Sequence, residues 1–261
     1  MTTQLLDSIP ILWFPLVFAI ITFAVYEIGF RIGVWWQERM PGNQEAPTGV
    51  LVGSLLGLMA FLLAVTMGLA ADRFDARRGL VVAEANAIGK TYLQADYLPD
   101  PQAEQMREHL REYLPLRVAT TDVAMLQANV KRSAELHTEM WAIAAEVARS
   151  GHSPDLVSSF GESLTDIVSL NQQRVVSGLY ARVPETVLLV LIAGSVLSLG
   201  MVGYSAGLSG ARSILSAVVL VVALGAVLTL VLDLDRPQEG FLIVSQQALL
   251  DVQKWIGPPS P

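Results

Sequence analysis

The residues most able to do chemistry in this sequence are charged side chains next to long apolar stretches. Glu27 and Arg31 are four residues apart at the end of the first such stretch, a spacing that places both side chains on one face of a helix. Ionisable residues inside a membrane span are functional candidates by default. Two interpretations of this pair stand equally, a functional intramembrane pair and an interfacial pair whose side chains reach water. Gly29 and Gly33 form a GxxxG pattern beside it, which favours tight helix packing.

Two further groups of charges follow apolar stretches. The first has both signs within two helical turns and predicts a charge network, with simple positive-charge anchoring as the alternative; it comprises Asp72, Arg73, Asp75, Arg77 and Arg78. The second comprises Asp233, Asp235 and Arg236. Two carboxylates two residues apart on a helix do not share a face. Pairing with the arginines of the first group is therefore favoured over a metal site.

Several kinds of chemistry are excluded or disfavoured. The chain has no cysteine, which excludes disulfides, thiolate zinc sites and cysteine nucleophiles. His109, His137 and His152 lack metal-ligand spacing, and we expect all three to be solvated surface residues. Phosphate loops, a nucleophile–base arrangement and HExxH are absent, so no catalytic residue, metal or cofactor is predicted and the chain is not expected to be an enzyme. A net charge of −7 argues against nucleic acid as a partner.

Four long uncharged stretches dominate the 261 residues. They are 8–26, 46–71, 186–211 and 213–232, of 19, 26, 26 and 20 residues, in a chain that is 16% charged overall. A helix needs about 20 apolar residues to cross the hydrocarbon core of a bilayer. A charge at the bilayer centre costs at least ~2.5 kcal/mol. Four buried helices of this length in a soluble protein are a far weaker explanation.

The sequence therefore predicts an all-α, multi-pass membrane protein in the lipid bilayer. Its soluble helical domain is formed by extensions and insertions between the second and third spans. The predicted segments are spans at 9–36, 48–71, 184–206 and 212–233, the domain at 72–183 and an amphipathic tail at 234–261. Pro10 and Pro15 lie at the start of the first span, where Pro15 is expected to kink the helix. A short turn is expected at 207–210.

The distribution of arginines predicts the orientation. Four crossings place both termini and the 72–183 domain on one side. That side has six arginines near membrane ends, namely Arg73, Arg77, Arg78, Arg174, Arg182 and Arg236. The opposite side has three, namely Arg31, Arg39 and Arg212. Positive residues near membrane ends mark the cytoplasmic side, so the domain and both termini are predicted to be cytoplasmic.

The second span should continue as one helix beyond the apolar stretch. A four-three spacing of side chains from Phe74 to Ala95 is typical of a packing seam, and no strong breaker precedes Pro99. We expect this helix to reach about Leu98, a break near Pro115 and a new helix at Pro154. The apolar residues of the tail suit either the membrane surface or the surface of the domain, and both alternatives stay open.

The second span has two faces. Small residues recur at three- and four-residue spacing, a pattern that lets helices approach closely in lipid; they are Gly53, Gly57, Ala60, Ala64, Gly68 and Ala71. The opposite face carries the large apolar residues Leu55, Leu58, Met59, Leu62, Val65 and Leu69. If copies of the helix surround an axis, this face forms a hydrophobic constriction. The alternative, which periodicity alone favours, is that it faces lipid.

The run from Ala71 to Gly89, ADRFDARRGLVVAEANAIG, resembles the signature of the bacterial bestrophin-like membrane proteins. Arg73-Phe74-x-Ala76-Arg77 after an apolar helix is similar to a motif at the same place in true bestrophins. The ending from Asp233 to Pro237 and the order of helices also match. The specific motifs cover about 25 positions, within a layout similar over 48–250.

True bestrophins are pentameric ion channels with cytoplasmic soluble parts and a hydrophobic neck on the second helix. The resemblance thus implies a homo-oligomeric channel for small inorganic ions in the bacterial inner membrane. Its neck would fall among Leu58, Phe61, Leu62 and Val65. The acidic cluster that forms the calcium clasp of animal bestrophins is missing after the fourth span, so calcium gating is not implied. The alternative hypothesis is a non-conducting membrane scaffold or sensor whose cytoplasmic domain binds a protein partner.

Overall fold

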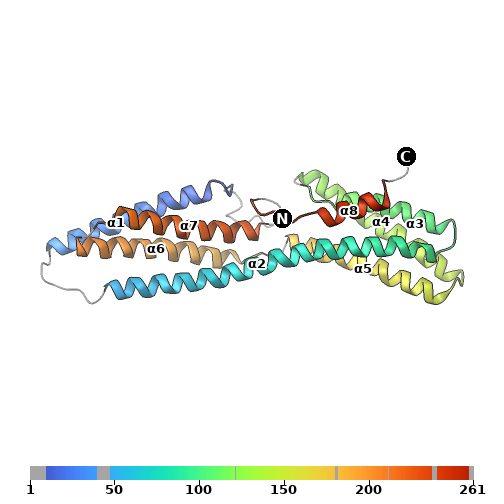
Figure 1. Cartoon of the computed structure of the whole chain (residues 1–261), viewed down its shortest axis with the longest axis horizontal. Coiled ribbons are helices and arrows are strands. Elements are labelled where there is room, and N and C mark those ends of the chain that lie inside the picture. Colours follow the sequence, from blue (N-terminus) through green and yellow to red (C-terminus); the bar gives the residue numbers. More distant parts are fainter. Residues whose placement is uncertain are drawn as a thin grey trace. The chain divides into compact units, whose positions relative to one another are not determined.

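All regular secondary structure is helical in the part of the chain that the computed structural model describes, residues 10–39, 48–120, 122–179, 182–210, 212–236 and 240–258. Four of the helices are long and apolar enough to cross a membrane, which confirms the predicted fold class. The helices are α1 (Phe14–Arg39), α2 (Thr48–Gln94) with a 3₁₀ turn (Ala95–Tyr97), α3 (Gln102–Leu116), α4 (Val123–Arg149), α5 (Pro154–Leu179), α6 (Glu185–Ser209), α7 (Ile214–Asp235) and α8 (Gln247–Ile256) (Figure 1).

The chain forms two compact units that share one helix. The membrane unit comprises Met1–Phe74 and Arg182–Leu242, and the soluble unit comprises Asp75–Ala181 and Ile243–Pro261. Helix α2 contributes to both, because it runs without a break from the apolar stretch to Gln94. The predicted continuation of the second span is therefore confirmed.

Prolines and capping residues set most of the helix ends. Helix α3 ends one residue after Pro115, α5 begins at Pro154, and α6 begins directly after Pro184. Gly210 ends α6 in the left-handed conformation with φ of +65°, a geometry that glycine adopts without a steric penalty. The structure differs from two expected boundaries, the start of the first span and the turn after the third span. Helix α1 begins at Phe14, with Pro15 in its first turn, whereas the expected start at Ile9 lies outside the described residues.

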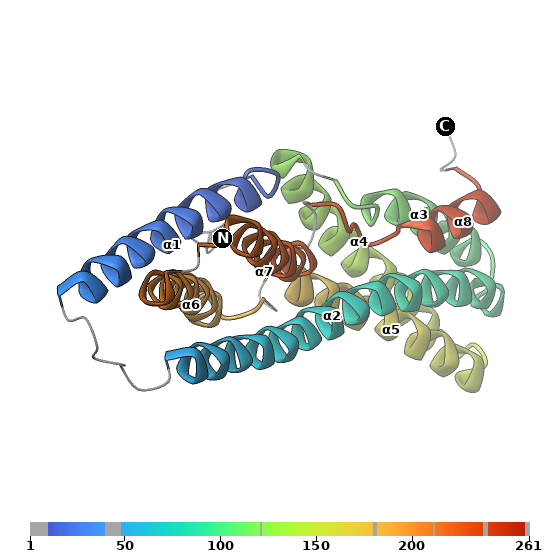
Figure 2. The same ribbon diagram turned by 60° about the vertical axis from the view of Figure 1, so that its left-hand side comes forward.

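The expected turn at 207–210 is shorter than predicted, because Gly207 belongs to α6 and packs against α1. Helices α1 and α6 cross so closely that their backbones are in direct contact. A Cβ atom built on Gly29 would fall on the carbonyl oxygen of Gly200, and one on Gly203 would fall on the carbonyl oxygen of Tyr26. Figure 1 shows α1 beside α6, and Figure 2 shows α6 nearly end-on next to α1. The GxxxG prediction is confirmed, and its partner is another glycine-rich helix of the same chain.

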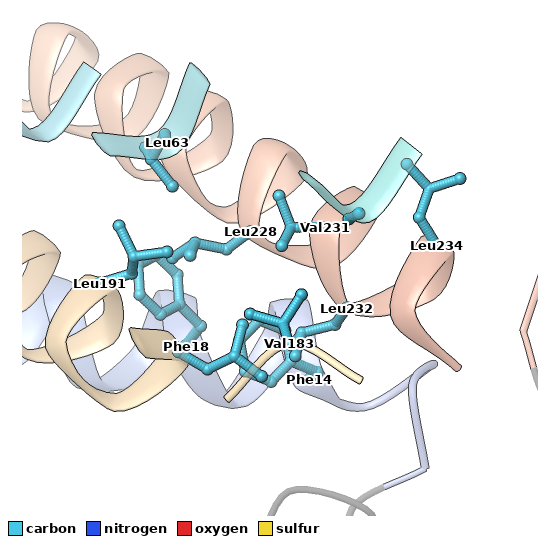
Figure 3. Packing of buried hydrophobic residues seen from close by; sticks show 11 residues of the cluster. Phe14, Phe18, Leu63, Val183, Leu191, Leu228, Val231, Leu232 and Leu234 are labelled. Carbon is cyan, nitrogen blue, oxygen red and sulfur yellow. The ribbon is translucent and has the colours of Figure 1, made fainter. Parts of the chain in front are cut away.

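A hydrophobic cluster holds the other end of the membrane unit together. Phe14 and Phe18 of α1 stack on one another with ring centroids 6.0 Å apart. They pack among Leu188 and Leu191 of α6 and residues of α7, including Leu228 and Val231 (Figure 3). Helix α2 adds only Leu63 and Ala70 as fully buried members. Its apolar window is 17% buried, against 33% for α6, so α2 is the span least covered by its own chain.

The soluble unit has a core of its own. Helix α3 packs on α4, and α4 packs on α5. The largest side chains without solvent exposure include Tyr113 of α3, Met140 of α4 and Phe160 of α5. Of the seam predicted from Phe74 to Ala95, four apolar positions are buried, namely Val81, Ala85, Ile88 and Ala95. Phe74 and Tyr92 are half-buried, and Arg78 is exposed.

The C-terminal helix α8 is part of the soluble unit and packs on α3, which settles an alternative that the sequence leaves open. The Trp255 ring meets Tyr92 edge-on at 5.8 Å, over Gly89. Arg111 of α3 donates its Nε–H to the carbonyl oxygen of Ile256 at 3.2 Å, which caps the end of α8. Hydrogen bonds to Glu104 first, and to Glu108 and Tyr92, raise the pKa of Arg111 above its ordinary value.

The glycine contact gives the first prediction. We expect Gly203→Val to lower the thermal unfolding midpoint clearly, because the two backbones must separate to admit the side chain; overpacking typically costs about 1–3 kcal/mol. Circular dichroism of the protein in detergent measures the midpoint. Gly49→Ala is the matched control, because a Cβ atom there meets nothing within 4 Å. A midpoint equal to that of the control would show that α1 and α6 do not need this close approach.

Candidate functional site

The membrane half of α2 presents a wide uncovered face. At about 100° per residue, the exposed positions between Gly53 and Leu69 cover roughly half of the helix circumference. The buried positions Met59, Leu63, Thr66 and Ala70 occupy the other side. Met59 fits against Gly194 of α6, where its sulfur takes the place of a Cβ atom. One side of the helix therefore packs against its own chain, and the exposed half of its circumference is free to contact lipid or another chain.

The predicted strip of small residues lies on the uncovered side. Gly53, Gly57, Ala60, Ala64 and Gly68 are all exposed, and Cβ atoms on the three glycines would meet nothing within 4 Å. Ala71, the last of the series, is half-buried. In the described part of the chain no helix packs against this strip.

The large apolar residues of the span differ in exposure. Leu58, Phe61 and Val65 are 52%, 63% and 47% exposed, and Leu69 lies with them. Leu62 is half-buried and packs against the core cluster, Met59 is buried, and Leu55 is half-buried. The uncovered face thus has two adjacent parts, a small-residue strip and a ridge of Leu58, Phe61 and Val65.

The charged residues at the end of this stretch differ in burial. Asp72, Asp75 and Arg78 are exposed, Arg73 is half-buried, and Arg77 is buried. The Nη1 atom of Arg73 is buried and has no hydrogen-bond partner among the described residues. Arg73 belongs to the membrane unit and Arg77 to the soluble unit.

The carboxylates in the last turn of α7 accept hydrogen bonds from backbone N–H groups. Asp233 accepts hydrogen bonds from the N–H groups of Phe241 and Leu242, at 2.8 and 3.0 Å. Asp235 accepts one from the N–H of Val183 at 2.7 Å. Both carboxylates and Arg236 are almost fully buried. Gly240, with φ of +132°, lies against the Asp233 carboxylate, where any Cβ atom would collide.

Glu27 and Arg31 form the predicted ion pair, and Arg212 also binds Glu27. Arg31 donates its Nε–H to Oε1 of Glu27 at 3.2 Å, and Arg212 donates from Nη2 to Oε2 at 2.7 Å. Arg212 precedes α7 and also lies over the Phe30 ring at 5.1 Å. Sequence spacing predicts the first contact, whereas the second joins residues 185 positions apart and has no local signal.

Sequence reasoning missed the buried charge cluster of the soluble unit. Glu84 of α2 has no solvent exposure and accepts hydrogen bonds on Oε1 from Arg117 Nε at 2.8 Å and Tyr113 Oη at 3.0 Å. Arg174 of α5 binds Oε2 of Glu84. Its Nη2 also donates to the carbonyl oxygen of Arg117 and to Gln246. The available sequence signal is a lone carboxylate among alanines and valines, next to the seam position Ala85.

His137 adjoins this cluster and shows that one expectation is wrong. Its ring lies 5.0 Å from the Tyr113 ring, and its Nε2 is buried without a hydrogen-bond partner in the described residues. Burial first, and then the charge of Arg117, lower the pKa of His137. Burial and the Glu84 charge raise the pKa of Tyr113. His137 is therefore a partly buried neutral side chain rather than a solvated one.

The other two histidines are half-buried. His152 Nε2 lies 3.1 Å from the carbonyl oxygen of Tyr97, and His109 Nδ1 lies 3.7 Å from Glu139. Within the described ranges no three His, Cys, Asp or Glu residues are grouped to hold a metal ion.

Comparisons with known proteins agree with this architecture. The family model of the Bestrophin-like domain matches residues 19–249. No curated protein matches the sequence. Two solved structures of a bacterial bestrophin homologue from Klebsiella pneumoniae are similar in fold. One, with the mutation Y211A, has a TM-score of 0.70 and 13% identity over 92% of this chain and 96% of that chain. The other, phased with zinc, has a TM-score of 0.69 and 13% identity over 94% and 97%.

The Glu84 cluster gives the second prediction. We expect Glu84→Gln to destabilise the protein by about 3–5 kcal/mol, because it leaves the buried guanidinium of Arg117 and the half-buried one of Arg174 without their counter-charge. Chemical unfolding in detergent, followed by circular dichroism, measures the loss. Glu135→Gln is the matched control, since its pair with Arg132 is exposed and worth at most about 1 kcal/mol. Equal effects of the two substitutions would contradict the role of Glu84.

His137 gives the third prediction. Its pKa is lowered in the folded state, so the unfolded chain binds a proton more readily and stability falls as the pH drops below about 6.5. The loss is complete once the pH passes the folded-state pKa. We expect His137→Gln to remove this part of the difference in unfolding midpoint between pH 7.5 and 5, and His109→Gln to retain it. Parallel pH profiles for wild type and His137→Gln would disprove the assignment.

Proposed function

The chain belongs to the Bestrophin-like family, and we propose that it is a homo-oligomeric channel for small inorganic ions in the bacterial inner membrane. The observation that carries the proposal is the uncovered face of α2 between Gly53 and Leu69. A span that its own chain covers so sparingly suits a position where copies of the same helix surround an axis.

The two parts of this face have complementary roles in such an assembly. The strip of Gly53, Gly57, Ala60, Ala64 and Gly68 would contact α2 of a neighbouring copy, because small residues let helix backbones approach in lipid. The ridge of Leu58, Phe61 and Val65, with Leu62 at its inner edge, would then line the axis as a hydrophobic neck. An apolar constriction blocks ions by excluding water until it widens. Five copies, as in true bestrophins, is our proposed number.

The orientation belongs to the same proposal. We place both termini and the soluble unit in the cytoplasm, because arginines concentrate at that end of the spans. The exposed charges Asp72, Asp75 and Arg78 would then lie at the cytoplasmic end of the α2 span, whereas Asp233, Asp235 and Arg236 are buried in the membrane unit. Ions leaving the neck would meet both signs of charge there.

Conductance measurements test the neck. We expect purified protein in planar bilayers to give discrete currents, and Phe61→Ala to raise the open probability or unit conductance several-fold, because a shorter side chain weakens the dewetted barrier. Leu58→Ala should act in the same direction. Val219→Ala is the matched control, since this exposed valine belongs to α7.

Two results would contradict the proposal. One is a folded, monomeric protein that stays silent in several salts. The other is a set of currents that Phe61→Ala and Leu58→Ala leave unchanged. A monomer or dimer whose soluble unit captures a specific protein would favour the scaffold hypothesis instead.

A further inference from the structure

A hollow of about 450 Å³ lies beside the second half of α1 in the membrane unit. One face of α1 supplies most of its walls, and Arg212 supplies the rest. Four of its lining side chains are charged, namely Glu27, Arg31, Glu38 and Arg212. A hollow that carries this many charges next to a membrane span is suited to a polar ligand.

Glu27 orders the two arginines of the hollow. One carboxylate oxygen binds Arg31 at 3.2 Å and the other binds Arg212 at 2.7 Å. The contact of Arg212 with the Phe30 ring fixes its guanidinium further. The Arg31 and Arg212 side chains are still 77% and 45% exposed, so each has N–H groups facing the outside. Two guanidinium groups against one carboxylate leave one positive charge, and their forked donors match the oxygens of a phosphate.

Aromatic residues place the hollow at the level of lipid headgroups. Trp35 lines it, and Trp36 follows directly in the sequence. Arg39 lies over the Trp35 ring at 4.3 Å. Tryptophans followed by a basic residue at the end of an apolar helix are typical of the membrane–water interface. A phosphate that reaches the hollow from the bilayer belongs to a phospholipid.

The acidic residue Glu38 gives the hollow a second pole. It lies seven residues beyond Arg31 on α1, roughly 10 Å along the helix axis. A positive group bound there would be attracted by the exposed Glu38 carboxylate, while Arg39 already lies over the Trp35 ring. The two arginines and Glu38 thus complement the negative phosphodiester and the positive ammonium of a single headgroup.

We propose that this hollow binds the headgroup of a zwitterionic phospholipid. The phosphodiester accepts hydrogen bonds from Arg31 and Arg212, and the primary ammonium donates to the Glu38 carboxylate. The site is separate from the neck on α2 and does not depend on conduction.

Lipid binding to the full-length, delipidated protein in detergent tests the proposal. The probes are short-chain phosphatidylethanolamine, the matching phosphatidylglycerol and inorganic phosphate, and native mass spectrometry measures bound lipid. We expect Arg31→Gln and Arg212→Gln each to weaken phosphatidylethanolamine binding about tenfold, the effect of losing a charge-assisted hydrogen bond. Arg31→Lys should be intermediate, because it keeps the charge and loses the fork. Glu38→Gln should remove the preference over phosphatidylglycerol.

The control is Lys131→Gln, which removes an exposed positive charge from the soluble unit and should leave binding unchanged. Unfolding midpoints of the delipidated variants, equal to that of the wild type, show that the fold is intact. Inorganic phosphate that binds as tightly as the lipid would overturn the lipid assignment. Unchanged binding in both arginine variants would overturn the site. Loss of the oligomer in those variants without any lipid would show a contact between subunits instead.

Discussion

Glu84 places a negative charge where water does not reach it, and the soluble unit is arranged around that charge. An isolated buried carboxylate costs several kcal/mol, so it requires donors from its surroundings. Those donors come from separate helices, because Tyr113 and Arg117 belong to the end of α3 and Arg174 to α5. Arg174 extends the network to the carbonyl oxygen of Arg117 and to Gln246, just before α8. The cluster therefore specifies how these elements meet, which nonpolar packing alone does not specify as narrowly.

The membrane unit is held together by a different principle. Lipid is as apolar as leucine, so helices in a membrane gain little from burying more apolar surface against each other. Close contact between backbones supplies the attraction instead, and the glycines of α1 and α6 allow it. Helix α2 has an equally glycine-rich strip, yet no described residue of its own chain packs on it. Glycines spaced along a helix thus make contact within the chain between α1 and α6, whereas those of the α2 strip stay uncovered.

The spans, the continuation of α2 and the breaks at prolines follow from the sequence because their causes are local. Apolar length, missing charges and the geometry of proline act within a few residues. The Glu27–Arg31 pair and the Gly29–Gly33 contact are also local patterns. By contrast, Arg212 reaches Glu27 across 185 positions, and Asp233 binds backbone N–H groups, which every non-proline residue has. The sequence alone predicts a solvated His137, because the burial of this side chain depends on Tyr113, a residue of another helix.

The position of the uncovered face explains why α2, rather than another span, is the place to look for conduction. Helices α1, α6 and α7 also expose apolar residues such as Ile20, Val190 and Val219, and lipid is a sufficient partner for those surfaces. A strip of glycine and alanine is a poor surface for lipid packing, however, because it offers few side-chain atoms for dispersion contacts. A second helix fills such a strip far better than a mobile acyl chain. Since the strip adjoins the ridge of Leu58, Phe61 and Val65, a neighbour that covers the first also turns the second away from lipid. Periodicity alone favours lipid for this ridge, and the glycine strip, on which no described residue packs, is what supports our proposal of an axis.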